Sequence, residues 1–164
     1  MAREERKVCG LRFATPCERP SCIPIGRPRG VKALGIRYER TVAEALQRTY
    51  GTVPVKYGQW FEFHDANGRG YAQVDLLLHI ANMDHYVVGE CKLTDTEEAW
   101  RKLREFYLPI VKMATQRPCV GFVVCKNLTR ASDPRSVCDS FRTTLLKCLN
   151  GGSPVWHFLG RGPP

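Results

Sequence analysis

Residues 74–92, VDLLLHIANMDHYVVGECK, decide the predicted fold. This stretch contains two apolar runs, each too short for an ordinary helix, joined by a turn-like segment at residues 82–84. Short apolar runs bounded by turn residues favour β-strands. We therefore predict neighbouring strands over residues 71–80 and 86–92, with three charged residues in apolar surroundings.

Helices and strands are predicted on both sides of this stretch. Apolar residues at helical spacing indicate a helix from Leu34 to about residue 50, and a capping-box pattern at residues 94–97 begins a second helix that Pro109 should kink. The remaining predicted elements are strands over 60–63, 120–125 and 154–159 and a helix over 134–150. Three successive strands, taken as antiparallel, followed by helix-linked strands imply an α/β fold with a mixed sheet flanked by helices.

Positive charge is concentrated near the N-terminus. The chain of 164 residues has a net charge of +9, and residues 1–40 contain ten Lys/Arg against four Glu. Prolines and glycines interrupt any periodicity in residues 1–33, so we predict an irregular basic arm there and a single domain over residues 34–164. Such an arm suits a polyanion such as DNA; a disordered basic tail is the alternative. The predicted DNA-binding residues of the arm are Arg12, Arg19, Arg27, Arg29 and Lys32.

The chain contains eight cysteines, a density below that of a disulfide scaffold. No apolar run reaches about 18 residues and no signal-like stretch follows the charged N-terminus, so we expect no membrane span and an intracellular protein with reduced thiols. Cys9, Cys17 and Cys22 have the spacing C-x7-C-x4-C, which falls one ligand short of an ordinary zinc site. The pattern leaves open a structural Zn²⁺ with a fourth ligand from elsewhere, or three unliganded thiols.

Asp75, Glu90 and Lys92 form the pattern with the clearest chemistry. Glu90 and Lys92 are two positions apart on a predicted strand, so their side chains share one face of the sheet. Burying such charges is costly unless they pair or bind a metal ion. Two carboxylates offer the oxygen ligands that Mg²⁺ prefers, and a neighbouring lysine can stabilise charge on a phosphate. The set suits metal-assisted phosphodiester hydrolysis; a structural Glu–Lys pair with an unrelated aspartate is the alternative.

These residues resemble the motif of the PD-(D/E)xK nuclease superfamily. Val74-Asp75 stands at the place of its PD, with valine instead of proline, and Glu90-Cys91-Lys92 stands at its (D/E)xK. The likeness covers residues 35–126, or 35–159 with the last helix and strand. It implies a restriction-endonuclease-like fold with an α-β-β-β-α-β core, and a Mg²⁺-dependent deoxyribonuclease, with Mn²⁺ as a substitute, that leaves a 5′-phosphate. In this resemblance Asp75, Glu90 and the Cys91 backbone carbonyl would bind the metal ion, and Lys92 would position or activate the attacking water.

Many members of the superfamily also have a glutamate on the first helix that faces the metal ion, and Glu39 and Glu44 compete for this place. The neighbours of Glu39 at helical spacing are apolar, whereas those of Glu44 are polar, so Glu39 is predicted to border the buried face. It would support a second metal ion or orient water. Residues 38–46 and 155–158 also loosely resemble the Holliday-junction resolvases of this superfamily, which are usually homodimers.

Gln73 shares a strand face with Asp75 and is predicted to contact the scissile phosphate, unless it is an ordinary polar residue at a strand start. Arg101, Lys102 and Arg104 are predicted on the solvent-exposed side of the second helix. The leading functional prediction is a metal-dependent DNA endonuclease, with a resolvase acting in DNA repair or recombination as the specific candidate. An exonuclease or restriction-type nuclease of the same fold, and a non-catalytic nucleic-acid-binding protein, are the alternatives.

Overall fold

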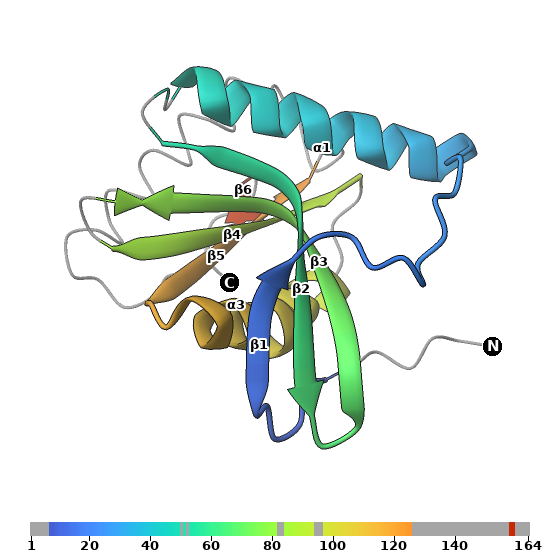
Figure 1. The fold of residues 1–164 in the computed structure, drawn as a ribbon. Coiled ribbons are helices and arrows are strands. Elements are labelled where there is room, and N and C mark those ends of the chain that lie inside the picture. Colours follow the sequence, from blue (N-terminus) through green and yellow to red (C-terminus); the bar gives the residue numbers. More distant parts are fainter. Residues whose placement is uncertain are drawn as a thin grey trace.

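A mixed sheet forms the centre of the described part of the protein (Figure 1). The computed structural model describes residues 7–49, 51, 53–81, 84–93, 97–125 and 158–159. The six strands within these ranges lie in the sheet in chain order: β1 (Phe13–Cys17), β2 (Val55–Asp65), β3 (Gly68–Ile80), β4 (His85–Lys92), β5 (Cys119–Cys125) and β6 (Phe158–Leu159). β1 to β4 pair antiparallel, whereas β5 pairs parallel with both β4 and β6.

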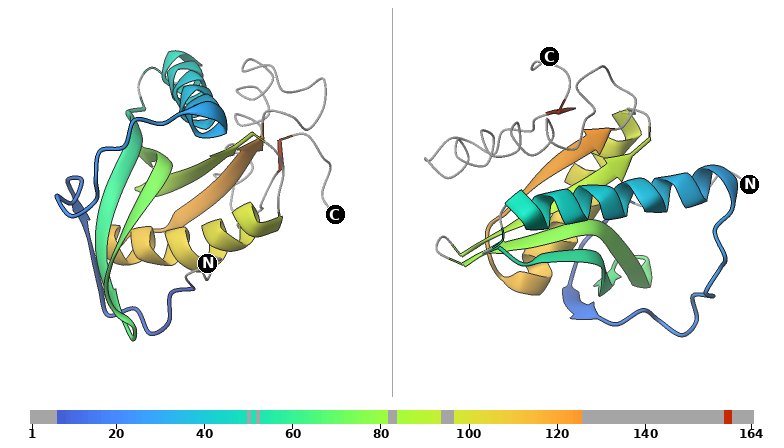
Figure 2. Two further views of the ribbon diagram at one scale, coloured as in Figure 1. Left: turned by 90° about the vertical axis from the view of Figure 1, so that its right-hand side faces the viewer. Right: turned by 90° about the horizontal axis from the view of Figure 1, so that it is seen from above.

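Helices cover both faces of this sheet. α1 (Gly30–Thr49) crosses one face, and the other face carries α2 (Glu97–Lys102), the π-helical segment η2 (Leu103–Tyr107) and α3 (Leu108–Thr115) (Figure 2). α1 buries Val42 and Leu46 against one side of the sheet, and α3 buries Ile110 against the other. The predicted α/β fold, with a mixed sheet flanked by helices, is therefore confirmed at this level.

The amphipathic pattern of the sequence explains α1. Tyr38, Val42 and Leu46 recur at helical spacing and are all buried. The helix begins earlier than predicted, at Gly30. Leu34 lies on the same side of the helix as these residues but remains 48% exposed. This side of α1 therefore packs on the sheet only from Tyr38 onwards.

The prediction of an irregular arm over residues 1–33 is wrong where it includes β1. Residues 13–17 pair with residues 60–64 of β2, and Ala14 is buried in the core. Pro16 makes this strand hard to predict from the sequence, because proline lacks the N–H that a central strand needs. It is tolerated because β1 is an edge strand of the described sheet. Residues 18–29 contain neither helix nor strand and lead from β1 to α1.

The second predicted helix changes its hydrogen bonding at residues 103–107. There the Leu108 N–H donates to the Leu103 carbonyl, five residues earlier, which defines a π-helical turn. Pro109 follows at once as the second residue of α3. In an α-helix the proline ring would clash with the carbonyl four residues earlier. The wider π-helical turn over residues 103–107 accommodates Pro109, at the place where we predicted a kink.

Some predictions fall on residues outside those described: the capping residues 94–96, the helix over 134–150 and most of the strand over 154–159. The described part of that strand, Phe158–Leu159, pairs with residues 123–124 of β5. Across the described ranges, no helix combines the length and the apolar character that a membrane crossing requires.

Candidate active site

Asp75 lies where β3 separates from both of its neighbours. The pairing of β3 with β4 runs from Ile80 back to Leu76 and ends there, while β4 continues alongside β5. On the other side, β2 and β3 pair before and after Asp75 but not at Asp75 itself. The Asp75 carboxylate instead accepts a hydrogen bond of 2.8 Å from the Cys91 N–H. The Asp75 carboxylate thus takes the place of a backbone acceptor for the Cys91 N–H, because β3 and β4 are no longer paired at this point.

Gly58 of β2 lies opposite Asp75, at the break between β2 and β3. Its φ of +64° is a left-handed conformation. A Cβ at this position would lie 2.8 Å from the side-chain nitrogen of Gln73. That nitrogen donates to the Gly58 carbonyl at 3.3 Å. Glycine therefore allows the local bend of β2 and the close approach of Gln73 beside the carboxylate.

Gly58→Ala is expected to lower the free energy of unfolding by about 1–2 kcal/mol, because alanine resists the left-handed conformation. Gly35→Ala, within α1, is the matched control: its new methyl group meets no atom within 4 Å. Since alanine favours a helix over glycine by about 1 kcal/mol, the control should be more stable than the wild type. Urea unfolding measures both variants, and a Gly58→Ala protein as stable as the wild type would contradict the proposed backbone requirement.

Glu90 is the one charged side chain that is buried among the described residues, with 1% of its surface exposed. Lys92 shares its face of β4, as predicted, and places Nζ 2.5 Å from Oε1 of Glu90. Oε2 of Glu90 is buried and has no hydrogen-bond partner in the described structure. A buried carboxylate with an unsatisfied oxygen is costly, and such groups gather at binding and catalytic sites.

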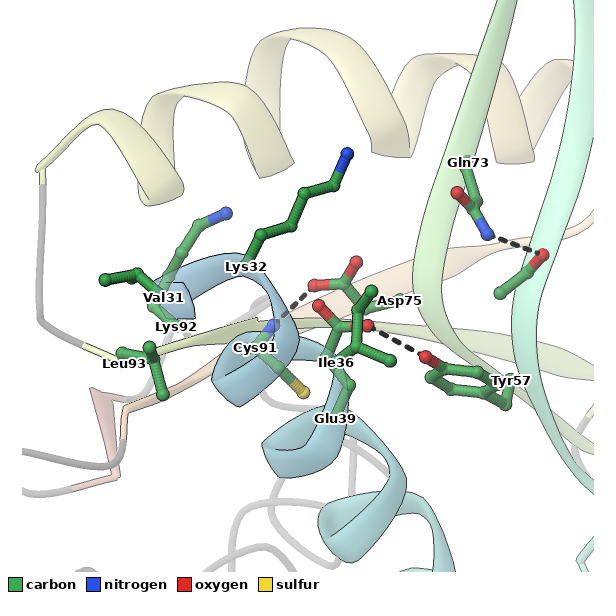
Figure 3. Close-up of a pocket in the computed structure, with 12 residues that line it drawn as sticks. Val31, Lys32, Ile36, Glu39, Tyr57, Gln73, Asp75, Cys91, Lys92 and Leu93 are labelled. Atoms are coloured by element: carbon green, nitrogen blue, oxygen red, sulfur yellow. Dashed lines mark hydrogen bonds between the residues drawn. The ribbon is translucent and has the colours of Figure 1, made fainter. Parts of the chain in front are cut away.

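Glu39 reaches the same region from α1. Its Oε2 accepts a hydrogen bond of 3.1 Å from the Tyr57 hydroxyl. Both residues line a pocket together with Asp75 (Figure 3). Glu44, in contrast, is exposed on α1. The spacing of apolar residues thus predicted correctly which of the two glutamates faces inward.

The pocket has a volume of about 430 Å³ and lies between α1 and strands β2, β3 and β4. Its polar lining consists of Lys32, Glu39, Tyr57, Gln73, Asp75 and Lys92, with the Cys91 thiol beside them. Lys32 and Gln73, both predicted to contact DNA, therefore lie beside the carboxylates. In Figure 3 the ammonium groups of Lys32 and Lys92 extend toward the same side. A pocket lined by both carboxylates and ammonium groups can hold a cation and a phosphate side by side.

Burial and the closeness of several carboxylates shift the pKa values of the charged residues at this site. Burial, followed by the charges of Glu90 and Glu39, raises the pKa of Asp75 to about 8. Burial also raises the pKa of Glu39, opposed by the Tyr57 hydrogen bond and assisted by the Glu90 charge. Burial alone would lower the pKa of Lys92, but the surrounding carboxylates, Glu90 above all, raise it. Lys92 is therefore a cation at neutral pH, which favours charge stabilisation over proton removal from water.

The raised pKa of Asp75 predicts that the metal-free protein loses stability as the pH rises. The folded protein keeps this proton up to about pH 8, whereas an ordinary aspartate releases it near 3.8. The resulting stabilisation is complete below the ordinary value and is lost as the pH rises through about 8. Asp75→Asn cannot ionise, so its melting temperature should exceed that of the wild type at about pH 9, and this advantage should shrink toward about pH 4. Melting curves in EDTA across this range measure it, and an advantage that is independent of pH would contradict the assignment.

The donor set fits a divalent metal ion. Asp75, Glu90 and the Cys91 carbonyl offer the hard oxygen ligands that Mg²⁺ prefers, and the unpartnered Oε2 of Glu90 is free of protein donors. Two other carboxylate oxygens already have partners: Oδ2 of Asp75 accepts from the Cys91 N–H, and Oε1 of Glu90 contacts Lys92. In the ranges that the structure describes, no group of three or more His, Cys, Asp or Glu side chains is arranged to hold a metal ion. A bound cation would therefore have to replace some of the present contacts.

Sequence reasoning missed Tyr57 and placed Lys102 only partly correctly. Lys102 is 41% exposed, but its Nζ lies 3.8 Å from Oε1 of Glu90, so it belongs to the site and not simply to a solvated helix face. Tyr57 belongs to no recognisable motif, and its contact with Glu39 joins different elements. Gly58 did carry a signal, since an isolated glycine beside a strand pattern often marks a bulge or a close approach.

The other predicted DNA-binding residues do not line the pocket. Arg12 immediately precedes β1, and Arg19 donates to the Pro24 carbonyl. Arg27 and Arg29 are exposed on the segment that leads into α1. Lys32 is thus the one of the five predicted DNA-binding residues of the arm that lines the pocket. Their contact with DNA stays a prediction.

The three cysteines of the arm are free thiols. Cys9 and Cys22 are exposed, and Cys17 is half-buried in β1. Burial raises the pKa of Cys17, and the nearby Glu62 charge adds to the effect. The described residues include all three and contain no preformed metal-binding group, so the zinc site stays a prediction.

No protein-family model, curated protein or solved structure matches this chain.

Proposed function

We propose that this protein is a metal-dependent nuclease that hydrolyses phosphodiester bonds in DNA. One observation carries the proposal: Asp75, Glu90 and Lys92 converge where β3 and β4 separate, and Glu39 joins them from α1. Asp75, Glu39 and Lys92 line one pocket, and the buried Glu90 carboxylate, which does not line it, contacts Lys92 beside it. The succession of α1, β2, β3, β4, the α2–α3 helix and β5 agrees with the core that the PD-(D/E)xK resemblance implies. A restriction-endonuclease-like fold is therefore part of the proposal.

Each residue has a distinct role in the proposed reaction. Mg²⁺, with Mn²⁺ as a substitute, would be held by Asp75, Glu90 and the Cys91 carbonyl and would supply positive charge beside a phosphate oxygen. Lys92 keeps its proton and stabilises negative charge that develops on the phosphate. Glu39, whose pKa is raised, is suited to orient the attacking water and to accept its proton. The Tyr57 hydroxyl holds the Glu39 carboxylate in place.

The positive charges around the pocket support DNA as the substrate. Lys32 and Gln73 line the pocket beside the carboxylates and are suited to contact the phosphate that is cut. The exposed Arg27 and Arg29 precede Lys32 in the chain and can follow the backbone of the same strand. Within this class, a structure-specific endonuclease such as a junction resolvase is the narrower proposal. Such an enzyme would act as a homodimer, because two strands must be cut.

Cleavage of labelled DNA tests the proposal. Linear duplex, single-stranded, flap and four-way-junction DNA are incubated with the protein in Mg²⁺, Mn²⁺ or EDTA, with Asp75→Asn in parallel. We expect metal-dependent cleavage that leaves a 5′-phosphate and is lost in the variant. Internal and terminal labels separate an endonuclease from an exonuclease. A wild-type protein that cuts none of these substrates faster than Asp75→Asn would overturn the proposed activity.

A non-catalytic nucleic-acid-binding protein is the second candidate. The observation in its favour is that the carboxylates already have partners and that the described residues hold no preformed metal-binding group. Mg²⁺ separates the two candidates without any assay of activity. A ligand that binds only the folded state raises the melting temperature, so Mg²⁺ should stabilise the wild type but not Asp75→Asn if the metal site exists. DNA binding with no Mg²⁺ effect on melting favours the second candidate.

A further inference from the structure

Lys102, the last residue of α2, lies beside the buried carboxylate of Glu90. Its Nζ is 3.8 Å from Oε1 of Glu90, and it also lies 4.7 Å from the centroid of the Tyr107 ring. Lys92 contacts the same oxygen more closely, at 2.5 Å. Two ammonium groups thus approach one oxygen of one carboxylate, and the side chain of Lys102 is still 41% exposed.

The π-helical turn explains why the Tyr107 ring lies against Lys102. Lys102 and Tyr107 are five residues apart, which in an α-helix would place their side chains on different sides. In η2 the Leu108 N–H bonds to the Leu103 carbonyl, so the hydrogen bond spans five residues instead of four and the turn is wider than in an α-helix. Side chains five positions apart therefore come to the same side, and the Tyr107 ring lies beneath the ammonium group. The turn that accommodates Pro109 thus also places the Tyr107 ring against Lys102, whose ammonium group lies beside Glu90.

The charges around Glu90 leave the Lys102 cation only partly neutralised. Lys92 is the closer partner of Glu90, and the aromatic face of Tyr107 holds Lys102 without cancelling its charge. The field of Lys102 also reaches Glu39, whose pKa it lowers slightly against the dominant effect of burial. An exposed cation that is held in position beside the site is suited to bind an anion that arrives from solvent.

We propose that Lys102 is a phosphate-binding residue of this site, positioned by the π-helical turn and the Tyr107 ring to contact the backbone of a bound DNA strand. The identity of the anion rests on the proposed function, because a nucleic acid is the phosphate source that the site favours. Lys102 contributes a charge-assisted hydrogen bond to the substrate, while Lys92 remains with Glu90.

Arg104 offers a matched control. It lies on the same helical segment, carries the same charge and is 59% exposed, but its described partner is Glu105 and not Glu90. The variants are Lys102→Met, Lys102→Arg and Arg104→Met, each combined with Asp75→Asn so that DNA is bound and not cut. Affinity for a labelled DNA duplex is measured over a range of salt concentrations, and circular dichroism verifies that each variant is folded.

Lys102→Met is expected to weaken DNA binding by about tenfold, the loss of one charge-assisted hydrogen bond. Its slope of log K against log salt should fall by about 0.9, the value for one phosphate contact. Arg104→Met should change the affinity by less than about twofold, and Lys102→Arg should restore most of it. Equal effects of Lys102→Met and Arg104→Met on affinity and slope would overturn the proposal.

The outcomes also separate this inference from the proposed function. If the wild type cuts DNA but Lys102→Met binds like Arg104→Met, the nuclease stands and the role of Lys102 is wrong. If no DNA is cut but Lys102→Met alone loses affinity and slope, the phosphate contact stands and the nuclease is wrong. If the Asp75→Asn protein binds no DNA even at low salt, the contact that we assign to Lys102 is wrong.

Discussion

Asp75→Asn is expected to slow DNA cleavage by about a thousandfold or more, the loss of several kcal/mol of transition-state stabilisation that a metal ion supplies. The asparagine oxygen can still accept the hydrogen bond of the Cys91 N–H, so the local backbone should be preserved. DNA affinity should not fall, because the substitution adds no negative charge to the pocket. Single-turnover cleavage and equilibrium binding measure the two effects separately.

Asp65→Asn is the matched control for this prediction. Asp65 lies at the β2–β3 turn, where its carboxylate accepts a hydrogen bond from the Asn67 N–H, and it does not line the pocket. Asparagine can make the same contact, so this variant should cut DNA at the wild-type rate. The raised pKa of Asp75 also predicts that Asp75→Asn is more stable than the wild type above neutral pH, so a loss of cleavage cannot be attributed to unfolding. Equal cleavage by both variants would remove Asp75 from the site.

Glu39→Gln is expected to slow cleavage by about a hundredfold, at the lower end of what a positioned proton acceptor contributes. Glutamine has nearly the same shape and can keep the hydrogen bond from the Tyr57 hydroxyl, but it cannot accept a proton from water. Glu44→Gln makes the same chemical change on the exposed side of the same helix and should leave the rate unchanged. Single-turnover rates at saturating enzyme compare the two, and similar rates would exclude Glu39 from the chemistry.

Local patterns in the sequence were enough to locate most of the elements that build the site. The apolar runs around residues 76–80 and 86–89 predicted β3 and β4, because the residue types and the length of an apolar run indicate a strand. Helical spacing also predicted that Glu39 faces inward and Glu44 outward, because a helix turns its residues by a fixed angle. For the same reason, spacing along one strand predicted that Glu90 and Lys92 share a face.

Local patterns failed where the conformation depends on a neighbouring element. Pro16 is unfavourable for a strand at residues 13–17. β1 nevertheless forms, because it lies at an edge of the described sheet, where one row of backbone donors needs no partner. Helical periodicity placed Lys102 on the solvent side, because it assumes a constant turn. The π-helical turn before Pro109 changes that angle and places Tyr107 against Lys102, whose Nζ lies 3.8 Å from Glu90.

Asp75, Glu90 and Lys92 could be selected as candidates for the proposed chemistry from the sequence, because charged residues within apolar strand patterns stand out without any structure. How these side chains meet depends on the packing of helices and strands. The Asp75 carboxylate reaches the Cys91 N–H because β3 separates from β4 at this point, and Glu39 is held by Tyr57 because α1 packs across β2. These contacts join residues far apart in the chain. The free energy of forming these contacts depends on how whole strands and helices pack together, and this packing cannot be predicted from a local pattern of residues.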